Sequence, residues 1–126
     1  MVARTPFARA RALGASGTGT REYWLVKLSS VALLPLTVFL IGLLVALKDG
    51  GHAAAASALA APWVAVPLAL FVLANAVHMR LGLQQVIDDY VHGKASKKIA
   101  VALNLFFSWG IAVAALYFVI MIGLGA

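Results

Sequence analysis

The sequence predicts an all-α membrane protein with three transmembrane helices, its N-terminus in the cytoplasm and its C-terminus on the opposite side. The 126 residues are 63% hydrophobic and only 11% charged, whereas an ordinary soluble domain carries about 25% charged residues. Three long stretches, 28–47, 53–79 and 99–126, contain no Lys, Arg, Asp or Glu. A bilayer span needs about 20 predominantly apolar residues, so each stretch is long enough to cross.

Residues 1–20 are predicted to be a flexible basic tail, and residues 21–126 a three-helix transmembrane anchor domain. The tail contains Arg4, Arg9 and Arg11 but no acidic residue, and it ends in a run of Gly, Ser and Thr. Such a run does not form a helix by itself. A cleaved secretory signal is disfavoured because its apolar region would be shorter and would begin earlier, so we expect the tail to be retained.

The first span is predicted at 28–47, after an interfacial segment that contains Tyr23 and Trp24. Aromatic residues of this kind lie at the depth of the lipid head groups. Pro35 falls inside the span and is expected to kink it. A turn is expected at 48–52, and the Ala-rich residues 53–61 fit either a loop helix or an early start of the second span.

The second span is predicted at about 63–91 and the third at about 99–123, with a basic turn at 92–98 between them. At 1.5 Å per residue, a helix over 63–91 is about 42 Å long, which exceeds the ~30 Å hydrocarbon core. Its last turns must therefore emerge into the interface, where Asp88 and Asp89 lie.

The distribution of Lys and Arg predicts the orientation. The N-terminal flank and the second turn lie on the same side and together carry eight of these residues, against Lys48 alone in the first turn; the eight are Arg4, Arg9, Arg11, Arg21, Lys27, Lys94, Lys97 and Lys98. Short cytoplasmic loops carry the excess of positive charge. Because these charges flank apolar spans, they fit anionic lipid head groups of the bilayer, and no nucleic-acid partner is expected.

The candidate functional residues form one stripe on the second span. An ionisable residue inside a membrane helix is a functional hypothesis by default, and His78 is such a residue. At about 100° per residue, Gly82, Gln85 and Asp89 lie within roughly 60° of arc with it, and Tyr90 follows Asp89. A glycine one turn from an imidazole leaves room for a large flat ligand or another helix to approach.

The stripe leaves two interpretations open. Histidine is an axial ligand of electron-transfer haems, but His92 is about 21 Å away along the same helix and His52 is across the membrane, so another subunit would supply the second ligand. We then expect a ring nitrogen of His78 to face a foreign helix. If that nitrogen points into lipid or is bonded to a side chain of its own chain, the haem interpretation fails and only a three-helix membrane protein remains. Alternatively, the protein is a small membrane scaffold or transporter component in which His78 only bridges helices or relays protons.

Other residues have simpler interpretations. The absence of Cys excludes a disulfide framework, a thiolate metal site and a cysteine nucleophile. Asn75, Asn104 and Ser108 are expected to form hydrogen bonds between helices. Arg80 points about 200° away from His78 and belongs to another face.

The run from His78 to Gly93 resembles the signature of the succinate dehydrogenase hydrophobic membrane anchor subunit, the D subunit of respiratory complex II. Its pattern is a His, a Gly four residues later, and Asp-Tyr eleven and twelve residues after the His, here Gly82, Asp89 and Tyr90. Residues 17–36 also resemble the segment that leads into the first helix of that family.

The resemblance implies a role for each matching residue. His78 would be an axial ligand of a haem b shared with the cytochrome b556 (C) subunit, Tyr90 would donate a hydrogen bond to a ubiquinone carbonyl, and Asp89 would lie in the region that handles protons. Lys27 falls near the haem propionates, where the family commonly has Arg, and an ammonium lacks the bidentate fork of a guanidinium.

The implied protein is a non-catalytic subunit of an enzyme complex in the bacterial inner (cytoplasmic) membrane. It would pass electrons to quinone from an iron–sulfur subunit, and a flavoprotein subunit would complete the complex. The clusters must belong to another subunit because this chain has no Cys to hold them.

Overall fold

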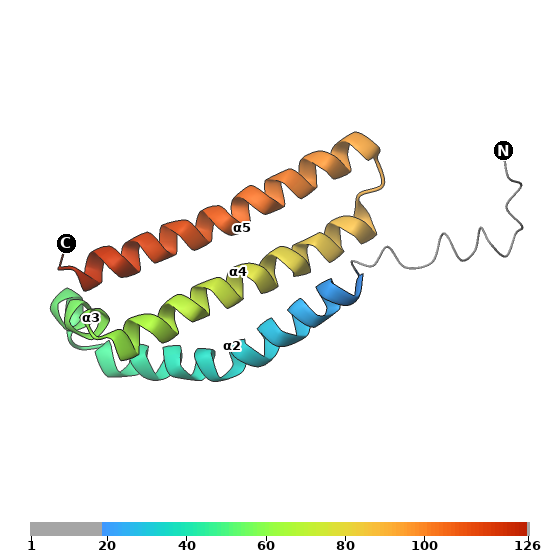
Figure 1. Cartoon of the computed structure of the whole chain (residues 1–126). Helices are drawn as coiled ribbons and strands as arrows, with labels where there is room; N and C mark the ends of the chain where they lie inside the picture. The colour runs from blue at the N-terminus through green and yellow to red at the C-terminus, as the bar shows by residue number, and fades with distance from the viewer. Residues whose placement is uncertain (1–18, 126) are drawn as a thin grey trace, which may run out of the picture.

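The structure is a computed structural model that describes residues 19–125, which form four helices (Figure 1). In chain order these are α2 (Gly19–Leu47), α3 (Gly51–Ala60), α4 (Pro62–Tyr90) and α5 (Lys94–Gly123). Three of them, α2, α4 and α5, are long and apolar enough to cross a membrane, which confirms that part of the predicted fold. The predicted tail lies outside the described residues, except that Gly19 and Thr20 already belong to α2.

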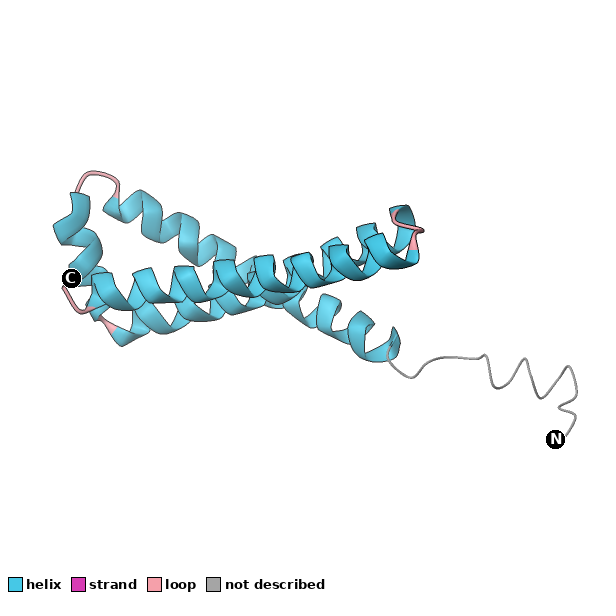
Figure 2. Cartoon of the chain, turned by 90° about the horizontal axis from the view of Figure 1, so that it is seen from above, coloured by secondary structure: helices cyan, strands magenta, loops and turns pink. Residues whose placement is uncertain are grey.

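The three long helices form a single layer with α4 in the middle. Helix α4 packs against both α2 and α5, whereas α2 and α5 do not pack against each other within residues 19–125. Seen from above, α2 crosses the α4–α5 pair at an angle (Figure 2). The start of α2, the end of α4 and the start of α5 lie at one end of the layer, and α3 lies at the other (Figure 1). An open layer of this kind leaves part of the central helix uncovered.

Two helices begin earlier than the sequence predicted. Helix α2 starts at Gly19 because the interfacial segment continues the span as one helix. Helix α5 starts at Lys94, so the lysines expected in a turn form its first turns instead, and only residues 91–93 link α4 to α5. Lysine is a good helix former, and Gly93 supplies the extended residue before the helix.

The Ala-rich stretch that fitted two interpretations is a separate helix, α3. Gly51 begins it with a φ of 61°, a backbone conformation that favours glycine. At the other end of the chain, a Cβ on Gly123 would lie 2.8 Å from the Leu59 carbonyl oxygen, so glycine lets the end of α5 approach α3 closely. The short helix therefore closes the end of the layer opposite the α4–α5 turn.

Small and polar side chains make the contact between α4 and α5. Ala76 is buried on α4, and Asn104, Ser108 and Ala112 form a buried row at intervals of four residues on α5. The Asn104 side-chain amide donates to the Arg80 carbonyl oxygen at 2.9 Å, and the Ser108 hydroxyl donates to Asn104 Oδ1 at 3.1 Å. Close approach through small residues and interhelical hydrogen bonds is the usual way in which membrane helices pack.

These contacts confirm the interhelical role predicted for Asn104. The prediction for Ser108 is wrong, because its hydroxyl bonds to Asn104 on the same helix and not to another helix among residues 19–125. Asn75 is exposed and forms no hydrogen bond with any residue from 19 to 125, so it makes no interhelical bond there either. Helix α2 changes direction along its length (Figure 1), and Pro35 lies inside it, where its missing N–H breaks the ladder of helix hydrogen bonds.

Candidate functional site

The centre of the candidate site is His78, on the middle helix α4. It lies twelve residues before Tyr90, so it is about 18 Å from the end of the helix. Its Nδ1 atom lies 3.1 Å from the Ser29 hydroxyl oxygen and 3.4 Å from the Ser30 hydroxyl oxygen, both on α2. One ring nitrogen is therefore bonded within its own chain, the arrangement that we expected to argue against ligation.

The other ring nitrogen, Nε2, is not used in this way. It forms no hydrogen bond with any residue between 19 and 125. Over the same residues, no buried side-chain nitrogen or oxygen lacks a partner. A fully buried Nε2 would be such an atom without a partner. Nε2 is therefore accessible at the surface of the described residues, which agrees with the partial burial of His78. A bond at Nδ1 with an accessible Nε2 is the usual arrangement of a metal-ligating histidine, so the self-contact does not exclude ligation.

Gly82, one turn further along α4, borders open space. A Cβ built on it meets no other atom within 4 Å outside its own helix. Its lack of a side chain is thus not required by the packing of this chain. The opening leaves room for a large flat group or a partner helix beside His78, as the sequence predicted.

The two aspartates at the end of α4 have different surroundings. The Asp88 carboxylate forms an ion pair with Lys97 at 2.8 Å, which joins α4 to the first turns of α5. It also accepts a hydrogen bond from Gln84, on its own helix, at 3.2 Å. Asp89 is exposed and has no such partner within the described part of the chain. The Tyr90 side chain is 77% exposed and also forms no hydrogen bond there. Asp89 and Tyr90 therefore remain available to a ligand.

Lys27 makes its contacts within α2. Its ammonium donates to the Tyr23 hydroxyl at 2.7 Å and lies 5.0 Å from the centre of that ring. The distance to the hydroxyl is within the normal range of a hydrogen bond, so we describe the contact as a hydrogen bond to the hydroxyl and not as a cation–π interaction with the ring face. The structure does not bring Lys27 into a hydrogen bond with the stripe on α4.

The chain holds its histidines apart. His52 lies in the first turn of α3 and His92 in the link between α4 and α5, so neither approaches His78 along the layer. Among residues 19–125, no three His, Cys, Asp or Glu side chains come together as a metal site. A metal centre built wholly from this chain is thus not formed in the described part, whereas a haem brings its own four ring nitrogens and needs only axial ligands.

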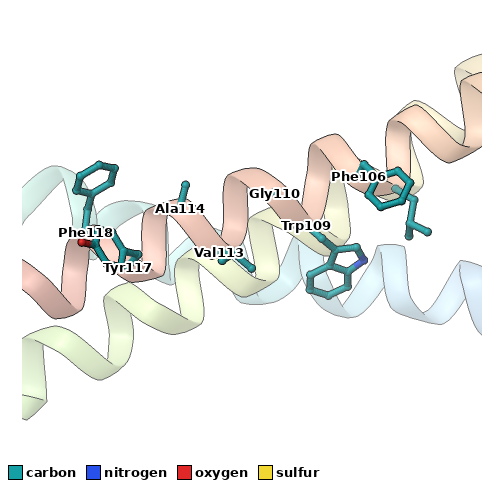
Figure 3. Close-up of a pocket in the computed structure, with 8 residues that line it drawn as sticks. Phe106, Trp109, Gly110, Val113, Ala114, Tyr117 and Phe118 are labelled. Carbon is teal, nitrogen blue, oxygen red and sulfur yellow. The ribbon is translucent and has the colours of Figure 1, made fainter.

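A groove of about 350 Å³ between α2 and α4 borders this site, because its lining includes Ser29 and Val77, the residue before His78. A larger groove of about 820 Å³ follows α5, and the side chains that line it include Phe106, Trp109, Tyr117 and Phe118 (Figure 3). Arg80 lines a small polar pocket of about 190 Å³ with residues at the start of α2. His78 itself lines none of these three, so the candidate site is identified by the polar atoms of α4, with the α2–α4 groove beside it.

Ser29 and Ser30 belong to the site but were not predicted from the sequence. They are adjacent hydroxyls inside a span whose only other polar side chain is Thr37, and this pairing is the signal by which they could have been found. Hydroxyls in membrane helices hydrogen-bond to backbone carbonyls or across to neighbouring helices. What the sequence could not supply was the rotation of α2 that turns both of them toward His78.

Comparisons with known proteins show the family to which the chain is similar. A family model described as "Succinate dehydrogenase/Fumarate reductase transmembrane subunit" matches residues 1–122. The chain is also 32% identical over 122 residues to the succinate dehydrogenase hydrophobic membrane anchor subunit of Paracoccus denitrificans, a match that covers 97% of this chain and 94% of that protein. No solved structure matches.

The chain belongs to the succinate dehydrogenase/fumarate reductase transmembrane subunit family. The resemblance found in the sequence is thereby confirmed, and the protein is a membrane anchor subunit of that family. Membership implies further subunits, because an anchor serves a complex. It also agrees with three helices that are able to span a membrane.

Proposed function

We propose that this subunit anchors a succinate:quinone oxidoreductase in the bacterial inner membrane and contributes one axial ligand, His78, to a haem b. The observation that carries the proposal is a membrane-helix imidazole bonded at Nδ1 to Ser29 and accessible at Nε2. It lies about 18 Å from the end of its helix, at a depth suited to a haem inside the bilayer. Gly82 beside it leaves the space that a flat macrocycle requires.

The second axial ligand comes from a partner, which we take to be the cytochrome b556 (C) subunit. His52 and His92 lie at the two ends of the layer and cannot share an iron with His78. When bound, the haem supplies a one-electron relay near the middle of the membrane. This chain would hold the imidazole through Ser29, and Gly82 would present no side chain toward the group.

The quinone-reduction site is proposed at the end of α4. Reduction of a quinone takes up two protons, so the site needs a hydrogen-bond donor and a group in contact with water. Tyr90 supplies a phenolic donor for a ubiquinone carbonyl, and Asp89 supplies an exposed carboxylate without a competing partner among residues 19–125. Asp88 is excluded from this role because Lys97 and Gln84 already engage it.

Electrons reach this subunit from an iron–sulfur subunit, which receives them from a flavoprotein subunit. Lys27 lies two residues before Ser29 on α2, and its ammonium can neutralise a haem propionate once it leaves Tyr23. The excess of Lys and Arg at the end that carries Tyr90 favours a cytoplasmic side for the N-terminus, the quinone site and the soluble subunits.

The experiment that tests the proposal is a reduced-minus-oxidised visible spectrum of the purified complex with His78→Ala. We expect the b-type band to disappear while the subunits remain assembled. His52→Ala is the matched control, since it removes an exposed histidine at the far end of the layer and should keep the band. A full band in the His78→Ala complex would refute ligation by His78.

A second function is favoured by the same hydrogen bond. In it, His78 only bridges α4 to α2 through Ser29, or relays protons, and the protein is a scaffold or transporter component. The spectrum separates the two functions, because a bridging histidine predicts an assembled complex whose haem content does not depend on His78.

A further inference from the structure

We propose that Ser29 is a positioning residue that holds the His78 imidazole in the tautomer with hydrogen on Nδ1 and a bare lone pair on Nε2. The inference rests on the proposed role of His78 as an axial ligand and adds the group that prepares it. Ser30 acts as a weaker second partner, because its oxygen is 3.4 Å from Nδ1 while that of Ser29 is 3.1 Å away.

A count of hydrogens favours one tautomer. The Ser29 and Ser30 hydroxyls both donate to the Val26 carbonyl oxygen, at 2.9 and 2.8 Å. A hydroxyl has a single hydrogen, so once that hydrogen is committed to Val26 the oxygen can only accept. Nδ1 must then be the donor, and a neutral imidazole with hydrogen on Nδ1 has an unprotonated Nε2.

The opposite tautomer fits the same positions less well. With Nδ1 unprotonated, Ser29 would have to turn its hydrogen from Val26 to the ring, and one of the two hydrogen bonds would be lost. If the hydroxyl stayed on Val26, two acceptors would face each other at 3.1 Å. The Val26 carbonyl would keep the hydrogen bond from Ser30 in that case. The tautomer with Nδ1–H is favoured because it forms one more hydrogen bond at these positions.

The surroundings of Ser29 suit it to fix an orientation. This residue is only 6% exposed, and its bond to a carbonyl three residues earlier holds the hydroxyl on one rotamer of a long helix. The contact joins α2 to α4, so it also fixes the rotation of the imidazole relative to both helices. Ligands held on regular secondary structure by a bonded partner are more precisely placed than ligands on loops.

The hydrogen bond also affects the ligand strength of Nε2. Donation from Nδ1–H to an oxygen acceptor raises the basicity of the imidazole, which strengthens its bond to a metal. A more basic ligand favours the ferric over the ferrous state. Loss of the acceptor should therefore weaken haem binding and move the midpoint potential to a more positive value.

The test uses the purified complex with Ser29→Ala and with the double variant Ser29→Ala/Ser30→Ala. We measure haem per complex, the rate of haem transfer to an excess of apomyoglobin and the midpoint potential by redox titration. Loss of an outer partner of a ligating histidine typically lowers affinity about 10- to 100-fold. We expect a loss in this range for the double variant, a smaller one for Ser29→Ala, and a positive shift of potential in both.

Two controls separate positioning from simple packing. Ser29→Thr retains a hydroxyl that can bond to the same carbonyl, so it should restore the potential and haem retention of the wild type. Ser108→Ala removes another buried hydroxyl, which bonds within α5 at the α4–α5 contact, and should leave the potential unchanged. Equal shifts in the Ser108→Ala and Ser29→Ala complexes would overturn the inference.

The outcomes also separate this inference from the proposed function. If His78→Ala retains the haem, the proposed function fails, and the inference fails with it. If His78→Ala loses the haem but the double serine variant keeps the potential and haem retention of the wild type, ligation stands and positioning by Ser29 is wrong.

Discussion

Tyr90→Phe removes one oxygen from the end of α4 and should change quinone reduction without changing the fold. The Tyr90 side chain is 77% exposed and forms no hydrogen bond with residues 19–125, so the folded chain loses no described polar contact. An exposed substitution that leaves such contacts intact usually changes stability by less than about 0.5 kcal/mol. An effect on turnover would therefore reflect a lost contact with a ligand and not a change in the fold of the subunit.

The size of the effect follows from the single bond that is lost. A neutral hydrogen bond contributes about 0.5–1.5 kcal/mol net, which corresponds to roughly a 2- to 12-fold change in an equilibrium constant. If the phenol donates to the quinone carbonyl, the KM for quinone should rise by about that factor. A larger fall in turnover would show that the bond strengthens as charge develops on the quinone oxygen.

The assay compares two electron acceptors in the same complex. Reduction of a ubiquinone analogue by succinate should be impaired by Tyr90→Phe, while reduction of an artificial dye that accepts electrons upstream should stay nearly intact. Tyr117→Phe is the matched control, because it removes a 56% exposed phenol on the far half of α5. Equal losses with both acceptors, or equal losses in both variants, would refute a quinone-site role for Tyr90.

Three further predictions concern the same helices. Asp88→Asn should lower the thermal unfolding midpoint only slightly, because the Asp88 and Lys97 side chains are 47% and 41% exposed and exposed ion pairs contribute little. Asp89→Asn should instead slow quinone turnover and leave the unfolding midpoint unchanged. Reversed effects in the two variants would contradict this prediction. Asn104→Ala breaks two hydrogen bonds at the α4–α5 contact and should cost about 1–3 kcal/mol in a detergent unfolding titration, so an unchanged midpoint would count against the contact. Gly82→Leu fills open space and should leave helix content by circular dichroism unchanged while the haem band is lost; a full band would show that the space is not used.

The sequence predicted the spans because the bilayer imposes a simple rule on composition. Charge-free stretches of sufficient length must be helices, and Pro62 and Tyr90 at the ends of α4 lie within one residue of the expected bounds. The sequence was also sufficient to predict which side chains share one face of a helix. A step of about 100° per residue is enough by itself to put His78, Gly82 and Asp89 on one stripe.

What the sequence could not give were contacts between helices. Whether Ser29 faces His78 depends on the rotation and crossing of α2, which many weak packing contacts decide together. The same limit applies to Asp88 and Asp89, which are adjacent in sequence and equal in chemistry. Only the start of α5 at Lys94 brings Lys97 onto Asp88 and leaves Asp89 without that partner.

The arrangement of polar groups explains why this subunit needs a partner. Asn75 precedes His78 on α4 by three residues and is exposed without a hydrogen-bond partner among residues 19–125. Three residues on a helix bring the two side chains within about 60° of each other, so they share a face. An amide that faces lipid at this depth is costly, and α2 and α5, which pack on the flanks of α4, leave Asn75 exposed. A second chain that packs on this face would satisfy Asn75 and close the space over Gly82. If His78 ligates a haem as proposed, that second chain would also bring its own ligand opposite Nε2, and subunit assembly would complete the haem site.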